Sequence, residues 1–163
     1  MDNLPEVNIH ADGACLGNPG PGGYGVIFEF NGKTLKKSGG FRLTTNNRME
    51  LMGPIMALES LKKRCRVTVF SDSKYVVDAF EKGWAARWKR DGWKRNAKDA
   101  ALNPDLWQKL LALAARHEVS FQWVRGHNGH VENEECDRLS VEAAKGNVLE
   151  VDGGYECGAK RMF

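Results

Sequence analysis

Residues 126–140, GHNGHVENEECDRLS, concentrate metal-binding side chains. This stretch holds two histidines, one cysteine, one aspartate and three glutamates within fifteen positions. By residue type, His127, His130, Cys136 and Asp137 are the donors that a zinc site would use. Which of them binds a metal, and what the metal does, depends on carboxylates elsewhere in the chain.

Four acids come from four predicted elements: Asp12 and Asp72 close strands, Glu50 lies in the first turns of a helix, and Asp137 lies inside the last helix. Adjacent strand ends form the usual crevice for a site in an α/β sheet. Four converging carboxylates would repel strongly unless a divalent cation sat among them, and carboxylate oxygens favour Mg²⁺ or Mn²⁺ over zinc. Each acid taken alone is more readily explained as a helix cap or a solvated group, so spacing leaves the question open.

Hydrophobic periodicity predicts the elements that position these acids. A strand over 7–15 alternates apolar and polar residues, and Asn31-Gly32 predicts a two-residue hairpin between the next two strands. The glycine-rich residues 17–25 are predicted to form a turn region. Further predicted elements are helices at about 46–64, 74–82, 104–117 and 131–145, and strands at 66–72 and 119–124. This order predicts one α/β domain with a mixed sheet.

Composition is that of a globular domain, with 163 residues, 42% hydrophobic and 28% charged. No apolar run approaches the length of a membrane span, and the first residues lack a signal-peptide pattern. The four cysteines form no CxxC pair and no disulfide-framework spacing. We therefore expect reduced thiols and a cytoplasmic protein.

Charge is unevenly distributed. Residues 82–98 carry seven basic residues and one acid, a net charge of +6, which leaves −3 for the rest of a chain whose total is +3. An acidic body with one basic protrusion predicts a polyanionic partner.

The motifs around the four acids resemble those of type 1 ribonuclease H of the bacterial kind. They are DGACLGNPGPGGYG, TTNNRMELM, SDSKYV and GHNGHVENEECDRL, in unbroken order within residues 7–144. The tryptophan- and lysine-rich residues 84–98 are similar to the basic protrusion of that family. The resemblance implies a five-stranded mixed sheet with helices on both faces. It also implies a catalytic domain over 1–146, with the protrusion at about 82–99, and a loosely attached tail at 147–163.

The implied activity is endonucleolytic hydrolysis of the RNA strand of RNA–DNA hybrids, leaving 5′-phosphate and 3′-hydroxyl ends. The family's catalytic, metal-binding carboxylates carry over to Asp12, Glu50, Asp72 and Asp137. Two Mg²⁺ ions about 4 Å apart, with Mn²⁺ as a substitute, would activate water and stabilise the leaving oxygen. His127 matches the family's catalytic loop histidine, which moves protons or helps product leave. Asp137 is then the single metal ligand within 126–140, and His130 and Cys136 are structural, because their spacing does not fit a zinc finger.

Contacts to the RNA strand carry over to Asn18, Asn46 and Asn47, whose amides suit the 2′-hydroxyl. Lys74 stands where the family commonly has glutamine; a lysine reaches a phosphate but cannot accept from a hydroxyl. The alternative is that Asn18 and Asn46 serve turns and caps only.

Contacts to the DNA strand carry over to two groups. The protrusion supplies aromatic and basic side chains, which bind independently of sequence, and a phosphate pocket lies on the body. The alternative is that Trp88 or Trp93 packs the protrusion onto the body. Leu43 occupies the position where the family often has arginine, with Arg42 one residue earlier, which weakens the expected pocket. The expected DNA contacts are Thr45, Trp84, Trp88, Lys89, Arg90, Lys94 and Asn103.

Three other function classes remain: an inactive duplex-binding module of the same fold, a nuclease or transposase acting on DNA, and a small-molecule enzyme. Intact acids at all four positions disfavour the first. The basic protrusion and the asparagines favour a hybrid, bound by a monomer, over the other two.

Overall fold

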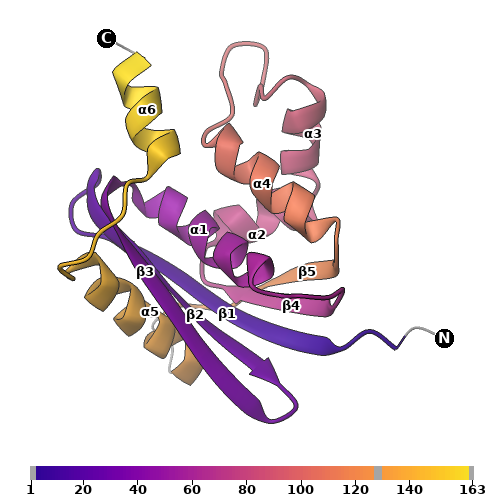
Figure 1. The fold of residues 1–163 in the computed structure, drawn as a ribbon. Coiled ribbons are helices and arrows are strands. Elements are labelled where there is room, and N and C mark those ends of the chain that lie inside the picture. Colours follow the sequence, from indigo (N-terminus) through magenta and orange to yellow (C-terminus); the bar gives the residue numbers. More distant parts are fainter. Residues whose placement is uncertain (1–2, 127–129, 162–163) are drawn as a thin grey trace.

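The computed structural model describes residues 3–126 and 130–161 and is built around one five-stranded sheet (Figure 1). The strand order is β3-β2-β1-β4-β5, with β1, β2 and β3 antiparallel and β4 and β5 parallel to β1. This confirms the mixed sheet. The strands are β1 (Glu6–Cys15), β2 (Gly20–Phe30), β3 (Lys33–Thr44), β4 (Arg66–Ser71) and β5 (Glu118–Trp123).

Helices cover both faces of the sheet, as the resemblance implied. Helix α5 contacts β1, β2 and β3 on one face, and α1 contacts β1 and β2 on the other, where it also contacts α4 (Figure 1). The helices are α1 (Asn46–Glu59), α2 (Lys74–Glu81), α3 (Trp84–Arg90), α4 (Pro104–Ala114), α5 (Val131–Ala144) and α6 (Gly153–Arg161). Within the described ranges, no helix is long and apolar enough to cross a membrane.

The prediction that residues 17–25 form a turn region is wrong for its larger part, because β2 already begins at Gly20. A Cβ on Gly23 would lie 2.4 Å from the carbonyl oxygen of Ser140, and one on Gly25 would lie 2.4 Å from that of Cys136. Glycines are therefore required where the backbone of α5 approaches β2. Side chains at these positions would push α5 away from the sheet.

The hairpin and the first helix follow local rules. Asn31 and Gly32 have φ values of 50° and 73°, as a type I′ hairpin requires, which confirms the predicted turn. Helix α1 begins after Thr45, whose side chain accepts a hydrogen bond from the Arg48 amide, and it ends at Glu59, earlier than predicted. Its apolar side chains Leu51, Ile55 and Leu58 are fully or almost fully buried against the sheet.

Two helices were not predicted from the sequence. Helix α3 lies within the basic protrusion, and α6 lies within the C-terminal tail. Asp152, just before α6, is 3% exposed and binds Arg48 and Thr44, while Glu150 forms backbone hydrogen bonds with Gly40 and Arg42. Residues 150–152 are thus tied to β3 and α1, whereas the division of the chain at residue 146 stays a prediction.

Candidate active site

Two of the four acids meet where the parallel pairing of β1 with β4 ends, although Asp12 lies within β1 and does not close that strand as predicted. Ala11 of β1 pairs with Ser71 of β4, so Asp12 and Asp72 follow at the same level of the sheet. Asp12 is 7% exposed, and its Oδ1 accepts a hydrogen bond of 2.9 Å from the Gly13 amide. The two carboxyl groups also lie within hydrogen-bonding reach of each other.

Glu50 approaches this pair from α1. A Cβ on Gly13 would lie 2.5 Å from the Met49 carbonyl carbon, so β1 and α1 touch backbone to backbone at this point. The Glu50 carboxylate accepts a 3.1 Å hydrogen bond from Nδ2 of Asn46, and the nearby Ser73 side chain favours its ionised form. Glu50 is therefore held in place by residues beside the other acids.

Asp137 approaches from α5, on the opposite face from α1. The glycines of β2 let the helix lie close to the sheet, and Sγ of the buried Cys136 lies 3.3 Å from the carbonyl oxygen of His10. Asp137 thereby comes close enough to Asp12 to act on its ionisation. The structure thus brings together the four acids that the sequence singled out.

The electrostatics of the cluster favour a positive charge at its centre. Burial, followed by the charge of Asp72 and a smaller effect of Asp137, raises the pKa of Asp12 from 3.8 to about 8, against the Gly13 hydrogen bond. Burial also raises the pKa of Glu50, with a further contribution from Asp72. Ionised together, these groups need a cation, and their donors are all oxygens.

The expected RNA-strand residues lie around the acids. Oδ1 of Asn18 accepts a 3.1 Å hydrogen bond from the Asn46 amide, so Asn18, Asn46 and Glu50 form one chain of contacts. Asn47 is exposed on the first turn of α1. Lys74 is exposed, and its Nζ lies 5.9 Å from the centre of the Trp123 ring.

Trp123 is a site residue that sequence reasoning missed. Its ring nitrogen donates a 3.1 Å hydrogen bond to the carbonyl oxygen of Asp72, and the residue is 44% exposed. Its position at the end of β5, beside β4, was the available signal. A Cβ on the nearby Gly126 would lie 2.8 Å from Oδ2 of Asp72, so the loop after β5 also passes this acid.

The two residues expected in the phosphate pocket are joined by Arg48. Its amide donates to Thr45 and its guanidinium to Oδ1 of Asn103, at 3.3 Å in both cases. The same guanidinium, in a residue 3% exposed, binds the carboxylates of Asp105 and Asp152 at 2.7–2.9 Å. Arg48 is a second residue that sequence reasoning missed, because its partners are remote in sequence.

Arg42 does not stand in for the arginine that Leu43 replaces. Its guanidinium binds Glu156 of α6 with two hydrogen bonds of 2.8 and 2.9 Å, and Leu43 is 37% exposed. Neither side chain therefore adds a free positive charge beside Thr45.

The residues of the protrusion differ in how far they are exposed to solvent. Lys89, Arg90 and Lys94 are exposed, and Nζ of Lys82 lies 5.5 Å from the centre of the half-buried Trp84 ring. Trp88, by contrast, is 3% exposed and packs against Tyr75 and Trp107, which leaves it little surface for a ligand. Trp88 thus attaches α3 to the body, in accord with the packing alternative.

The histidines of residues 126–140 have different positions. His127 lies outside the described residues. His130 is the N-cap of α5, and its Nδ1 accepts a 3.1 Å hydrogen bond from the Asn133 amide. This is the structural role expected of His130.

Comparison with known proteins agrees with this geometry. The sequence model of the RNase H family matches residues 5–145. A protein named ribonuclease H from Syntrophus aciditrophicus is 58% identical over 154 residues, 94% of this chain and 89% of that protein. Ribonuclease HI from a Synechocystis strain is 51% identical over 157 residues, 95% of this chain and 98% of that protein.

Solved structures show the same fold. LC9-RNase H1, described as a type 1 RNase H with the type 2 active-site motif, superposes with a TM-score of 0.79 at 38% identity, covering 98% of this chain and 82% of that one. LC11-RNase H1, solved in complex with an RNA/DNA hybrid, superposes with a TM-score of 0.66 at 24% identity, covering 85% and 96%.

A mixed sheet of this order, with acids converging from β1, α1, β4 and α5, defines a protein of the ribonuclease H fold. The chain belongs to the ribonuclease H family, in its type 1 branch.

Proposed function

We propose that the protein is an endonuclease that hydrolyses the RNA strand of RNA–DNA hybrids, leaving 5′-phosphate and 3′-hydroxyl ends. The observation that carries the proposal is the convergence of Asp12, Asp72 and Asp137, which together with burial raises the pKa of Asp12 to about 8. A site that needs positive charge is suited to divalent ions and a phosphodiester. The names of its relatives and the hybrid bound to LC11-RNase H1 support the substrate.

The donor set fits Mg²⁺, with Mn²⁺ as a substitute, because all four side chains offer hard oxygens. Asp12, Glu50, Asp72 and Asp137 would hold two such ions, which would supply Lewis-acid activation of water and neutralisation of phosphate charge. The hydrogen bond from Asn46 orients Glu50 for this role. We assign His127 to proton movement or product release.

Selection of RNA at the scissile strand is assigned to side-chain amides. Asn18 and Asn46 lie next to Glu50 and, with Asn47, would hydrogen bond to 2′-hydroxyl groups that DNA lacks. The Nζ of Lys74, which lies over the Trp123 ring, would move away from it to contact a phosphate of the same strand.

The DNA strand would cross from the pocket of Thr45 and Asn103 to the protrusion. There Trp84, Lys89, Arg90 and Lys94 would contact its backbone, and Trp88 would hold α3 beneath them. Such binding is independent of sequence and weakens as salt rises. Since Leu43 brings no charge to the pocket, the protrusion carries most of the affinity for this strand.

The proposal also covers the oligomeric state and the cellular location of the protein. One chain supplies all four acids, so a monomer is sufficient for activity. The four cysteines are free thiols, which is typical of the reducing cytoplasm.

An end-labelled RNA, offered single-stranded, paired with RNA and paired with DNA, tests the proposal. We expect cutting only of the DNA-paired RNA, only with Mg²⁺ or Mn²⁺, and none by Asp12→Asn. Binding to the hybrid without any cutting in metal would instead identify the duplex-binding module. If zinc, and not Mg²⁺, restored cutting when added after treatment with a chelator, the metal assignment would be contradicted.

A further inference from the structure

We propose a second cation site, distinct from the four acids, in which His10, Glu29 and Glu132 bind a transition-metal ion such as Zn²⁺. Each residue offers one ligand atom, and these atoms all lie within 4.8 Å of one another. Across residues 3–126 and 130–161, this is the one group of three or more histidine, cysteine or acidic side chains so close together.

Three elements bring the ligands together. His10 of β1 pairs with Ile27 of β2, and Glu29 lies two residues further along β2, on the same face of the sheet. Glu132 lies in the first turn of α5, which covers that face. His10 Nε2 is in direct contact with Oε1 of Glu29. The site is thus assembled from long-range contacts.

The charges of the group are unbalanced. Among the described residues, no lysine or arginine forms an ion pair with Glu29 or Glu132; their ion-pair partners are His10 and His130 respectively. The Nδ1 of His130 accepts the Asn133 amide and therefore carries no proton toward Glu132. A divalent ion supplies two positive charges and balances both carboxylates.

His10 is held as a ligand would be. Its ring stacks on Phe70 with centroids 4.9 Å apart and lies 5.6 Å from the His130 ring. The residue is 6% exposed, and Nε2 is the ring nitrogen that faces Glu29, whereas the buried Nδ1 has no hydrogen-bond partner. A ring in this position is already oriented and desolvated before an ion arrives.

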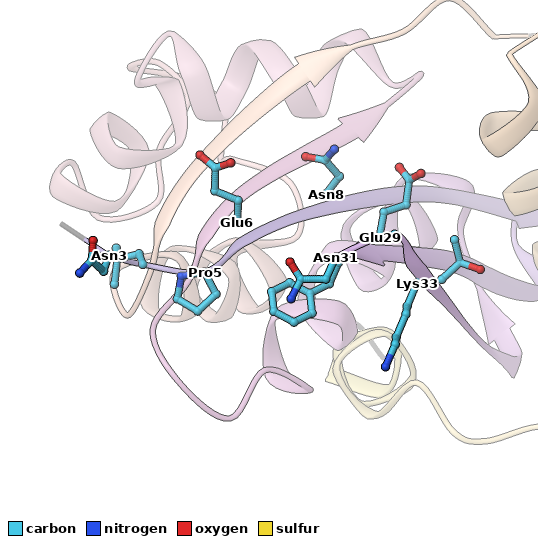
Figure 2. Close-up of a pocket in the computed structure, with 11 residues that line it drawn as sticks. Asn3, Pro5, Glu6, Asn8, Glu29, Asn31 and Lys33 are labelled. Atoms are coloured by element: carbon cyan, nitrogen blue, oxygen red, sulfur yellow. The ribbon is translucent and has the colours of Figure 1, made fainter.

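Two of the three proposed ligands are open to solvent. Glu29 lies on the wall of an open hollow of about 770 Å³ that is also lined by Asn8 and Lys33, but not by His10 or Glu132, and Figure 2 shows Glu29 and Asn8 on the same side of the strands. The carboxylates of Glu29 and Glu132 are 36% and 38% exposed as side chains, which leaves them accessible.

The chemistry of the donors separates this site from the catalytic acids. One imidazole nitrogen and two carboxylate oxygens suit Zn²⁺, with water as a fourth ligand, whereas an all-oxygen cluster suits Mg²⁺. A bound ion would join the first turn of α5 to β1 and β2. The same helix carries Asp137, so the second site would steady one of the four acids.

Calorimetric titration of the whole chain with Zn²⁺ tests the proposal. It measures binding alone, so its result does not depend on the proposed activity. We expect one zinc ion bound by Asp12→Asn, and at least about tenfold weaker binding by Glu29→Gln and by Glu132→Gln in that background. Glu135→Gln, on the same helix but paired with Arg138, is the matched control and should bind as the parent does. Equal zinc affinity in all these variants, or loss of all binding in Asp12→Asn, would overturn the proposal.

Imidazole nitrogen resonances of the Asp12→Asn protein give a second readout that does not depend on whether the glutamate variants fold. Zinc should shift the ring nitrogens of His10. Zinc binding that leaves those nitrogens unshifted would place the ion elsewhere and refute the site.

Discussion

Asp12→Asn should stabilise the folded protein while it removes one of the four proposed catalytic carboxylates. The pKa of this carboxyl rises from 3.8 to about 8 on folding, chiefly through burial and the charge of Asp72. A raised carboxyl pKa means that the folded state disfavours the charged form. The penalty is absent below pH 3.8, grows as pH rises, and is complete above pH 8.

The magnitude follows from the same two pKa values. At pH 7 they correspond to a penalty of at most about 4 kcal/mol, because the unfolded chain ionises freely and the folded chain does not. Asparagine keeps an oxygen to accept the Gly13 amide, but its own buried amide group costs free energy. We therefore expect a net gain of about 1–4 kcal/mol in the free energy of unfolding at pH 7.

Urea denaturation of both proteins at pH 5 and pH 8, without divalent ions, measures this effect. The gain should be larger at pH 8. Saturating Mg²⁺ should reduce it, since an ion that binds only the folded acids stabilises the wild type. Asp91→Asn, on the exposed protrusion, serves as the control and should change stability by less than about 0.5 kcal/mol. A gain independent of pH, or a loss of stability, would refute the electrostatic explanation.

Three further perturbations test other parts of the structure. Trp88→Ala should lower the free energy of unfolding by about 3–5 kcal/mol, measured in urea, because the side chain is buried; a near-neutral effect would contradict its packing role. Arg48→Met should lower the free energy of unfolding by a similar amount, because it leaves the carboxylate of Asp152 buried without its ion-pair partner. Arg138→Met breaks only exposed ion pairs and should lower it by less than about 1 kcal/mol. Lys94→Ala should reduce the slope of log affinity for a hybrid against log salt by about 1, measured with an uncut substrate analogue; an unchanged slope would exclude a phosphate contact.

Hydrophobic periodicity and turn residues were sufficient to predict most of the strands and helices from the sequence. Alternation located β1, the Asn31-Gly32 pair located the hairpin, and apolar periodicity located α1. The four acids were found mainly by the motifs around them. Local signals of this kind act over a few residues, which is why a single sequence reveals them.

The failures share a physical cause. The glycines of β2 resemble a turn because the reason for them, the approach of α5, lies more than a hundred residues away. Helix α6 has no clear period, and the segment leading into it is held by Asp152 on Arg48, 104 residues apart in sequence. The burial of Trp88 likewise depends on Trp107 in another helix. Long-range packing therefore decided each feature that local patterns missed.

The buried guanidinium of Arg48 has a consequence for the choice of duplex. On the first turn of α1 it is two residues from Glu50, and it also holds Asn103, the proposed contact for the opposite strand. Because the guanidinium and its partner Asp152 are buried, Arg48 would fix the spacing between the proposed cutting site and that contact. A duplex can engage both only when its two backbones are separated by the matching distance. The enzyme would thus select hybrids by groove width as well as by the 2′-hydroxyl, and it would do so without reading any base.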